Sequence, residues 1–179
     1  THGADYFRRW HRQKANSGGL MVHKATHHFD LVNWWIDSSP DVVFAQGGLK
    51  FYGPAFHKHG ERCITCPITA ECPFYTDLRE SATLTELYLN AEHEDGYFRD
   101  QCVFGEGITI EDSVSVNVRY KSGVAMAYSL VAFSPYEGFH ITFNGSRGRL
   151  ELIELERSYI SGHDGRIVRA TPESSVKLT

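Results

Sequence analysis

Imidazole and carboxylate side chains are concentrated in one short segment, residues 17–35. If this segment is helical, His23, His27, Asp30 and Trp34 recur at i, i+4, i+7 and i+11 and share one face. Removing the proton of a secondary alcohol needs a base that titrates near neutral pH, as an imidazole does. A nearby carboxylate can orient that imidazole and stabilise its charged form. The pattern predicts catalytic roles for His27, His23 and Asp30.

The adjacent stripe of the same helix adds a cation and another imidazole. Lys24 and His28 lie on it, and we predict that both contact substrate hydroxyl groups. Spacing alone leaves open a second interpretation, in which this is a surface helix whose histidines and aspartate only cap, pack or meet solvent.

Cysteine is the other residue type with a chemically suggestive spacing. Cys63-x2-Cys66-x5-Cys72, followed by Cys102, could supply four thiolates to a structural zinc ion or to an iron–sulfur cluster. Reduced buried cysteines or an incidental disulfide would give the same sequence. Either His57 or His59 could replace Cys102 as the fourth ligand. Otherwise both are solvated loop residues. We predict a structural zinc site at Cys63, Cys66, Cys72 and Cys102.

Further polar and aromatic side chains lie near the expected ends of strands. We predict Tyr136 and His140 as secondary substrate contacts, because an aromatic ring can stack on a sugar and an imidazole can hydrogen-bond it. Asp112 stands where a strand begins, and a structural role in the turn is favoured there over a catalytic one.

The first half of the chain is expected to be helical and then irregular. Residues 5–14 mix aromatic and charged side chains, 17–19 break the pattern, and helical spacing returns towards residue 36. Residues 41–49 are expected to form a buried strand, because an apolar run stands between Ser-Pro and Gly-Gly. Residues 50–107 form a loop-rich, cysteine-containing insert with a helix near 83–91.

From Asp112 onwards the hydrophobic period becomes two. Alternating apolar residues over 114–120 predict a half-buried strand, and 121–123 predict a hairpin turn into a second strand over 124–130. Further strands are expected over 139–143 and 150–155. Helices followed by hairpin-linked strands predict a single α+β domain over residues 1–179, with a mostly antiparallel open β-sheet and helices packed on one face.

Several segments in order resemble the C-terminal domain of the Gfo/Idh/MocA oxidoreductases. They are a Gly-Gly pair and apolar run before His27-x-x-Asp30 and Leu-Val-Asn-Trp-Trp, then residues 110–112, 118–120 with Gly123, and 143–151. The resemblance covers roughly Ser17 to Glu151.

The resemblance implies a two-domain enzyme whose Rossmann half, absent from this chain, binds NAD or NADP. This chain would close over a sugar, polyol or related hydroxy compound, with His27 at the family's histidine position. Where the family often has Asp, this sequence has His23, followed by Lys24. Neither the family's Glu-Lys-Pro motif nor a G-x-G-x-x-G is present, so the nucleotide contacts are expected mostly in the missing domain and the fragment alone is expected to be inactive.

Two other functions remain open at this point. A NAD-dependent glycoside hydrolase of the same fold would release sugar without net NADH production. A non-enzymatic domain would bind a metal or mediate assembly through its sheet. For the oxidoreductase as for these alternatives, we predict a homo-oligomer, such as a dimer, formed through the sheet.

Composition narrows the class of partner. The 179 residues are 41% hydrophobic and 22% charged, as in an ordinary globular domain, and the net charge is −4. An acidic chain lacks the basic surface that binds nucleic acid, and no stretch reaches the roughly 18 apolar residues of a membrane span. We therefore expect a small-molecule substrate, no nucleic-acid partner and no membrane partner. The chain begins without methionine and is treated as a fragment, so a cytoplasmic location is only the default expectation.

Overall fold

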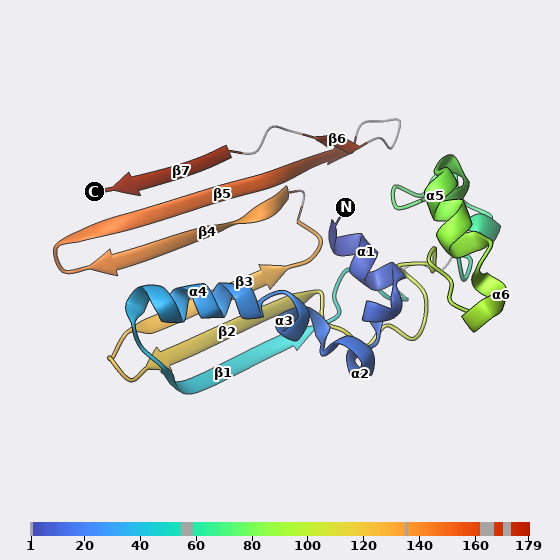
Figure 1. The fold of residues 1–179 in the computed structure, drawn as a ribbon. Helices are drawn as coiled ribbons and strands as arrows, with labels where there is room; N and C mark the ends of the chain where they lie inside the picture. The colour runs from blue at the N-terminus through green and yellow to red at the C-terminus, as the bar shows by residue number, and fades with distance from the viewer. Residues whose placement is uncertain (1, 55–58, 135, 162–166, 170–172) are drawn as a thin grey trace. The chain divides into compact units, whose positions relative to one another are not determined.

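The computed structural model describes residues 2–54, 59–134, 136–161, 167–169 and 173–179, and the chain divides into two compact units. One unit is Gly3–Phe133, and the other is Ser134–Thr179 together with Thr1–His2. Figure 1 shows the helices and strands that make up each unit. The α+β class predicted from the sequence is confirmed.

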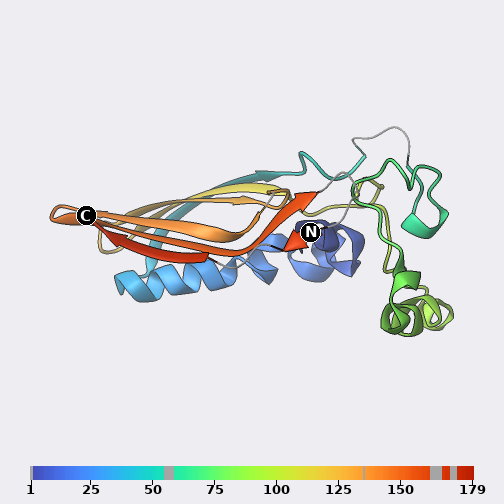
Figure 2. The same cartoon turned by 90° about the horizontal axis from the view of Figure 1, so that it is seen from above.

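The unit Gly3–Phe133 begins with helices. They are α1 (His2–Arg8), the 3-10 turn Trp10–Arg12, α2 (Lys14–Ser17), α3 (Gly19–His23) and α4 (Thr26–Ile36). Strand β1 (Pro40–Gly48) follows, then β2 (Ser113–Tyr120) and β3 (Ala125–Val131), which form one antiparallel sheet in the order β1-β2-β3. Helix α4 lies along one face of this sheet (Figure 2).

Alternation in β2 explains that packing. Val114, Val116, Val118 and Tyr120 are buried while the residues between them are not, as the period of two predicts. Val32 of α4 joins these four side chains in a hydrophobic cluster. The predicted hairpin after β2 is also present, since the Tyr120 N–H donates to the Val124 carbonyl and the Gly123 N–H donates to the Tyr120 carbonyl.

The expectation of a buried strand over 41–49 was wrong in its burial. Strand β1 is present, but Val42, Val43 and Phe44 are 48%, 58% and 58% exposed. The physical reason is that, among the described strands, β1 stands at the edge of its sheet beside β2, and the buried cluster beneath α4 is centred on β2.

Between β1 and β2, the described residues form only short elements. They are the 3-10 turns Cys63–Thr65 and Leu78–Glu80, helix α5 (Ala82–Leu84), a π-helical turn Thr85–Leu89 and helix α6 (Glu92–Asp95). A second hydrophobic cluster joins this segment to the first helices, and its buried members include Phe7, Tyr52, Val103, Phe104 and Ile110.

The unit that begins at Ser134 is a second antiparallel sheet. Strand β4 (Tyr136–Gly145) pairs with β5 (Gly148–Ser161), which also pairs with β6 (Ile167–Arg169) and β7 (Glu173–Leu178). The strand predicted over 139–143 therefore lies in β4 and pairs with β5 in a sheet separate from β1-β2-β3. Among the described residues, no helix has the length and apolar character needed to cross a membrane.

Candidate functional site

The segment that carries the predicted catalytic residues is two helices rather than one. Helix α3 ends at His23, Lys24 leaves helical geometry at φ −126° and ψ −51°, and α4 begins at Thr26. Both Lys24 and Ala25 donate backbone N–H groups to the Leu20 carbonyl, at 3.0 and 2.9 Å. The continuous helix expected from the spacing is therefore wrong.

This junction changes which side chains share a face. The Ala25 amide bonds five residues back, so an extra residue is wound into the chain and the helical phase is reset. Ala25 is fully buried at the bend. As a result the predicted single stripe does not form: His23 belongs to α3, whereas His27 and Asp30 are neighbours on α4.

His23 instead belongs to a cluster of rings near the start of the chain. Its Nδ1 lies 3.2 Å from the Tyr6 hydroxyl, and its Nε2 lies 3.2 Å from Nε2 of His11. Trp10 stacks on the His11 ring with centroids 3.8 Å apart. A chain of hydrogen bonds thus runs from Tyr6 through His23 to His11, and it holds the imidazole of His23 in place.

His11 is the buried member of this cluster. It is 5% exposed, and its Nδ1 has no hydrogen-bond partner among the described residues. Burial, with smaller contributions from the neighbouring Arg9, His23 and Arg99, lowers the pKa of His11 from 6.5 to about 4. At neutral pH His11 is therefore uncharged and can donate or accept a hydrogen bond with His23.

Lys24 and His27 stand on either side of the junction, and both are exposed. The His27 backbone N–H donates to the Lys24 carbonyl at 3.2 Å, which ties the two positions together. Asp30, one helical turn after His27, is also exposed and lines a shallow hollow with Asn33 and Lys121. These three predicted residues therefore lie on the surface, where a substrate can reach them.

His28 points towards the sheet. Its Nδ1 lies 2.9 Å from the Tyr128 hydroxyl, and burial raises the pKa of Tyr128 to about 12, so that the phenol keeps its proton. His28 is half-buried, which distinguishes it from the exposed His27 beside it.

The two remaining predicted substrate contacts lie on β4, in the unit that begins at Ser134. Tyr136 is 49% exposed. His140 is exposed, with its Nε2 3.3 Å from the Thr142 hydroxyl and 3.6 Å from a Glu151 carboxylate oxygen. Because they belong to the other unit, their roles as substrate contacts stay predictions.

Sequence reasoning missed Tyr6, Trp10 and His11. These residues lie 12 or more positions before His23, and no periodicity links them to it. The available signal was the local density of rings: Tyr6, Phe7, Trp10 and His11 fall within six residues. Only the packing of the first turns against α3 reveals that they surround a predicted catalytic histidine.

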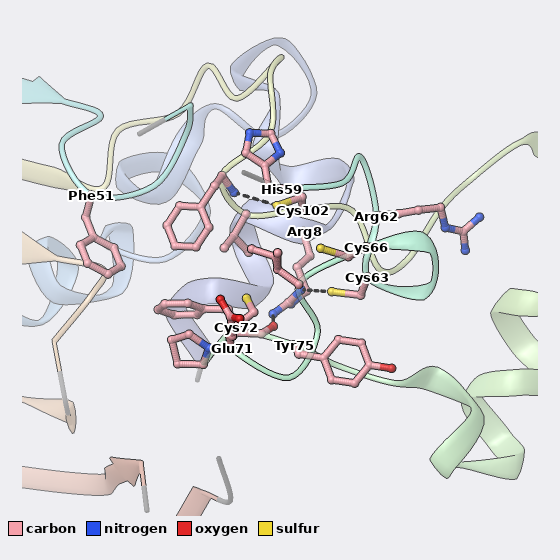
Figure 3. Close-up of a pocket in the computed structure, with 15 residues that line it drawn as sticks. Arg8, Phe51, His59, Arg62, Cys63, Cys66, Glu71, Cys72, Tyr75 and Cys102 are labelled. Atoms are coloured by element: carbon pink, nitrogen blue, oxygen red, sulfur yellow. Dashed lines mark hydrogen bonds between the residues drawn. The ribbon is translucent and has the colours of Figure 1, made fainter. Parts of the chain in front are cut away.

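The four cysteines are all free, and all line one cavity of about 190 Å³ (Figure 3). Burial raises the pKa of Cys72 and of Cys102. As the side chains stand, no three His, Cys, Asp or Glu residues of the described chain are assembled to hold a metal ion. The zinc site predicted from the spacing is thus not preformed, although the thiols meet in one place.

Comparison with known proteins identifies the family of this chain. Residues 1–178 match the family model described as "Oxidoreductase family, C-terminal alpha/beta domain", so this chain belongs to the Gfo/Idh/MocA family as its C-terminal domain. The resemblance inferred from residues 17–151 is therefore confirmed.

The chain is similar in sequence to a curated protein from Bacillus subtilis (strain 168) that is named "Putative oxidoreductase YteT". The two are 39% identical over 189 residues, which cover 98% of this chain and 43% of that protein. The chain thus spans less than half the length of this curated relative.

Proposed function

We propose that this chain is the substrate-side domain of an NAD(P)-dependent oxidoreductase that acts on a sugar, a polyol or a related hydroxy compound. The main observation that supports this function is the geometry of the α3–α4 junction, together with the membership of the chain in this oxidoreductase family. The junction exposes Lys24 and His27 at the surface and holds His23 between Tyr6 and His11.

We assign proton transfer to His27. An imidazole is well suited to take a hydroxyl proton at neutral pH, and His27 is accessible to a substrate. Asp30, one turn further along α4, would orient the His27 ring and stabilise its charged form. Lys24 would donate hydrogen bonds to substrate hydroxyl groups from the other side of the junction.

His23 and His28 would position the substrate rather than exchange its proton. The hydrogen bonds to Tyr6 and His11 restrict the His23 ring, and that to Tyr128 restricts the His28 ring. Restricted side chains lose less conformational entropy when a substrate binds.

The nicotinamide cofactor would supply or accept the hydride. The sequence contains no G-x-G-x-x-G segment, so this chain does not offer the usual loop that holds the pyrophosphate. We place the nucleotide contacts in another part of the whole protein, since the relative is more than twice as long as this chain. The isolated domain is accordingly proposed to be inactive.

The proposal is tested on the full-length protein by nicotinamide absorbance over a panel of sugars and polyols. His27→Ala and His27→Gln should each lower kcat/KM by roughly 10²-fold or more, because general acid–base catalysis contributes about that much. His93→Ala is the matched control, since His93 is an exposed histidine on α6, and it should leave activity unchanged.

If His27→Ala is as active as the wild type, the assignment of His27 is wrong. If glycosides are cleaved without net reduction of nicotinamide, the protein is a glycoside hydrolase instead. If no substrate is turned over by either route, a non-enzymatic role takes the place of both.

A further inference from the structure

The turn that carries Cys63 and Cys66 is held tightly against the segment that carries Cys102. Cys66 donates its N–H to the Cys63 carbonyl at 3.1 Å, which closes a compact Cys-x2-Cys turn. Arg62 and Gln101 form an antiparallel bridge. On either side of it, the Cys63 N–H donates to the Asp100 carbonyl and the Cys102 N–H donates to the Glu61 carbonyl, both at 2.9 Å. Three thiols thus come to one cavity from two backbone-paired segments, and Cys72 reaches it from the following loop.

Each of the four sulfurs accepts a hydrogen bond from an N–H group. Gly60 donates to Cys66 Sγ and Phe104 donates to Cys102 Sγ, both at 3.4 Å, while the backbone of Phe74 hydrogen-bonds Cys72. Arg8 Nη1 donates to Cys63 Sγ at 3.2 Å. Two of these contacts are drawn as dashed lines in Figure 3. For Cys72 and Cys102 these hydrogen bonds offset part of the effect of burial, which raises the pKa of both thiols.

The charge around the thiols also favours an anionic group. Arg8 and Arg12 are only 5% and 4% exposed. The Arg12 guanidinium donates to the Gln101 amide oxygen and the Glu106 carbonyl, and it interacts electrostatically with Cys102. Arg8 lies 3.9 Å from an Asp5 carboxylate oxygen, and its Nη2 donates to the Phe74 carbonyl. Buried cations of this kind are stabilised by a nearby negative charge.

We propose that Cys63, Cys66, Cys72 and Cys102 bind a structural zinc ion. Each thiol would release its proton to solvent and form one Zn–S bond. Two positive charges on zinc and one negative charge on each of four thiolates leave a net charge of −2, which Arg8 and Arg12 would offset. Binding requires the side chains to turn inwards, since the thiols are not assembled as they stand.

A metal has an evident structural purpose in this segment. Between β1 and β2 the described elements are turns and helices of at most five residues, so little local structure holds the loop of Cys72. A zinc ion would tie this loop to the backbone-paired turn, as structural zinc does in small loop-rich modules.

The test is the metal content of the full-length protein, purified without a metal-affinity tag and measured by inductively coupled plasma mass spectrometry. The wild type should carry about one zinc ion per chain, and Cys63→Ser, Cys72→Ser and Cys102→Ser should each lose most of it. Tyr75→Phe is the control: Tyr75 lines the same cavity but offers no zinc thiolate, so this variant should keep its zinc.

A second measurement uses the wild type alone and does not depend on how the variants fold. The four thiols should resist Ellman's reagent, become reactive after chelation, and be protected again by zinc but not by magnesium. Neither measurement uses the dehydrogenase assay, so the zinc proposal and the proposed function fail separately.

A wild-type protein that holds no zinc, with thiols that react before chelation, overturns the proposal. Iron with acid-labile sulfide would identify a cluster and overturn zinc. His59 also lines the cavity, so zinc loss in His59→Gln with retention in Cys102→Ser would overturn Cys102 as the fourth ligand.

Discussion

A single buried carboxylate, Asp112, ties the segment that follows β1 to the start of β2. It is fully buried, and its two oxygens accept the backbone N–H groups of Lys50, Phe51 and Tyr52 at 2.7–2.9 Å. It stands immediately before β2, the strand that α4 packs against. The structural role favoured from the sequence agrees with these contacts.

Asp112→Ala should therefore destabilise the protein markedly. Three backbone amides would lose a charged acceptor at a buried position, which costs about 3 kcal/mol or more. Calorimetry of the full-length protein would measure the change in melting temperature. Asp41→Ala is the control, because Asp41 pairs with Arg119 at the surface and its loss should cost under about 1 kcal/mol. Equal effects of the two variants would contradict this role for Asp112.

His11 gives the protein a predictable dependence on pH. Its pKa is about 4 in the folded state, below the ordinary 6.5, so the unfolded chain binds a proton more readily between these values. Stability due to neutral His11 is complete above pH 6.5 and is lost as pH falls towards 4, by at most about 3 kcal/mol. Melting temperatures from pH 4 to 8 should show this decline in the wild type and a flatter profile in His11→Gln. Parallel profiles would count against it.

At the scale of elements, the break before α3 lies at two glycines with positive φ, Gly18 and Gly19. Gly18 has φ +71°, a left-handed conformation, and a Cβ built on it would lie 2.7 Å from the Cβ of Val22. Gly18 ends α2 and precedes α3, so its conformation sets the direction of α3, the helix that ends at His23. Gly96 offers a close comparison, because it ends α6 at φ +72° with nothing within 4 Å of such a Cβ.

Gly96→Ala should cost about 1 kcal/mol, the usual penalty of a left-handed conformation for an L-residue. Gly18→Ala should cost clearly more, because it adds a clash with Val22 to the same penalty. Melting of both full-length variants by calorimetry would compare them. If Gly18→Ala lowers the melting temperature no more than Gly96→Ala does, the close contact between residue 18 and Val22 does not limit stability.

At the scale of the whole molecule, α4 covers one face of the β1-β2-β3 sheet, and within the described residues of Gly3–Phe133 no helix packs on the other face, which we call the open side. Residues paired across antiparallel strands share a face, so Val43 lies with Val118 on the α4 side, and Phe44 lies with Asn117 on the open side. Phe44 is 58% exposed. If the predicted homo-oligomer forms through this face, its interface would cover the exposed Phe44 ring.

If the open side is the subunit interface, Phe44→Lys should shift the full-length protein to a smaller mass in light scattering. A lysine there would have to be desolvated against the partner subunit. Val43→Lys is the matched control, since Val43 is equally exposed but lies on the α4 side, and it should keep the oligomer. A wild-type monomer, or an unchanged mass for Phe44→Lys, would contradict the sheet-mediated assembly.

Local pattern was sufficient for several parts of the structure. The alternation of β2, the hairpin at 121–123 and the helix that carries Phe29 and Val32 depend on neighbours in the sequence, and each is observed. The family was also evident from ordered short segments, because residues that share a local environment keep a recognisable spacing.

Other features were decided only by tertiary contacts. The burial of a strand depends on what covers it, which is why the apolar run of β1 is exposed at an edge. The junction at Lys24 and Ala25 resets the helical phase, so the four-residue spacing of His23 and His27 does not place them on one helix face. In the ring cluster, Tyr6 and His11 meet His23, which lies 17 and 12 positions later. In the cavity, Cys63, Cys66 and Cys72 meet Cys102, which lies 30 to 39 positions later. The amino-acid sequence by itself determined the class of fold, the family and the candidate residues, because these follow from local periodicity and spacing. Only the tertiary structure decided which candidates meet, since a long-range contact depends on the path of the whole chain between its two ends.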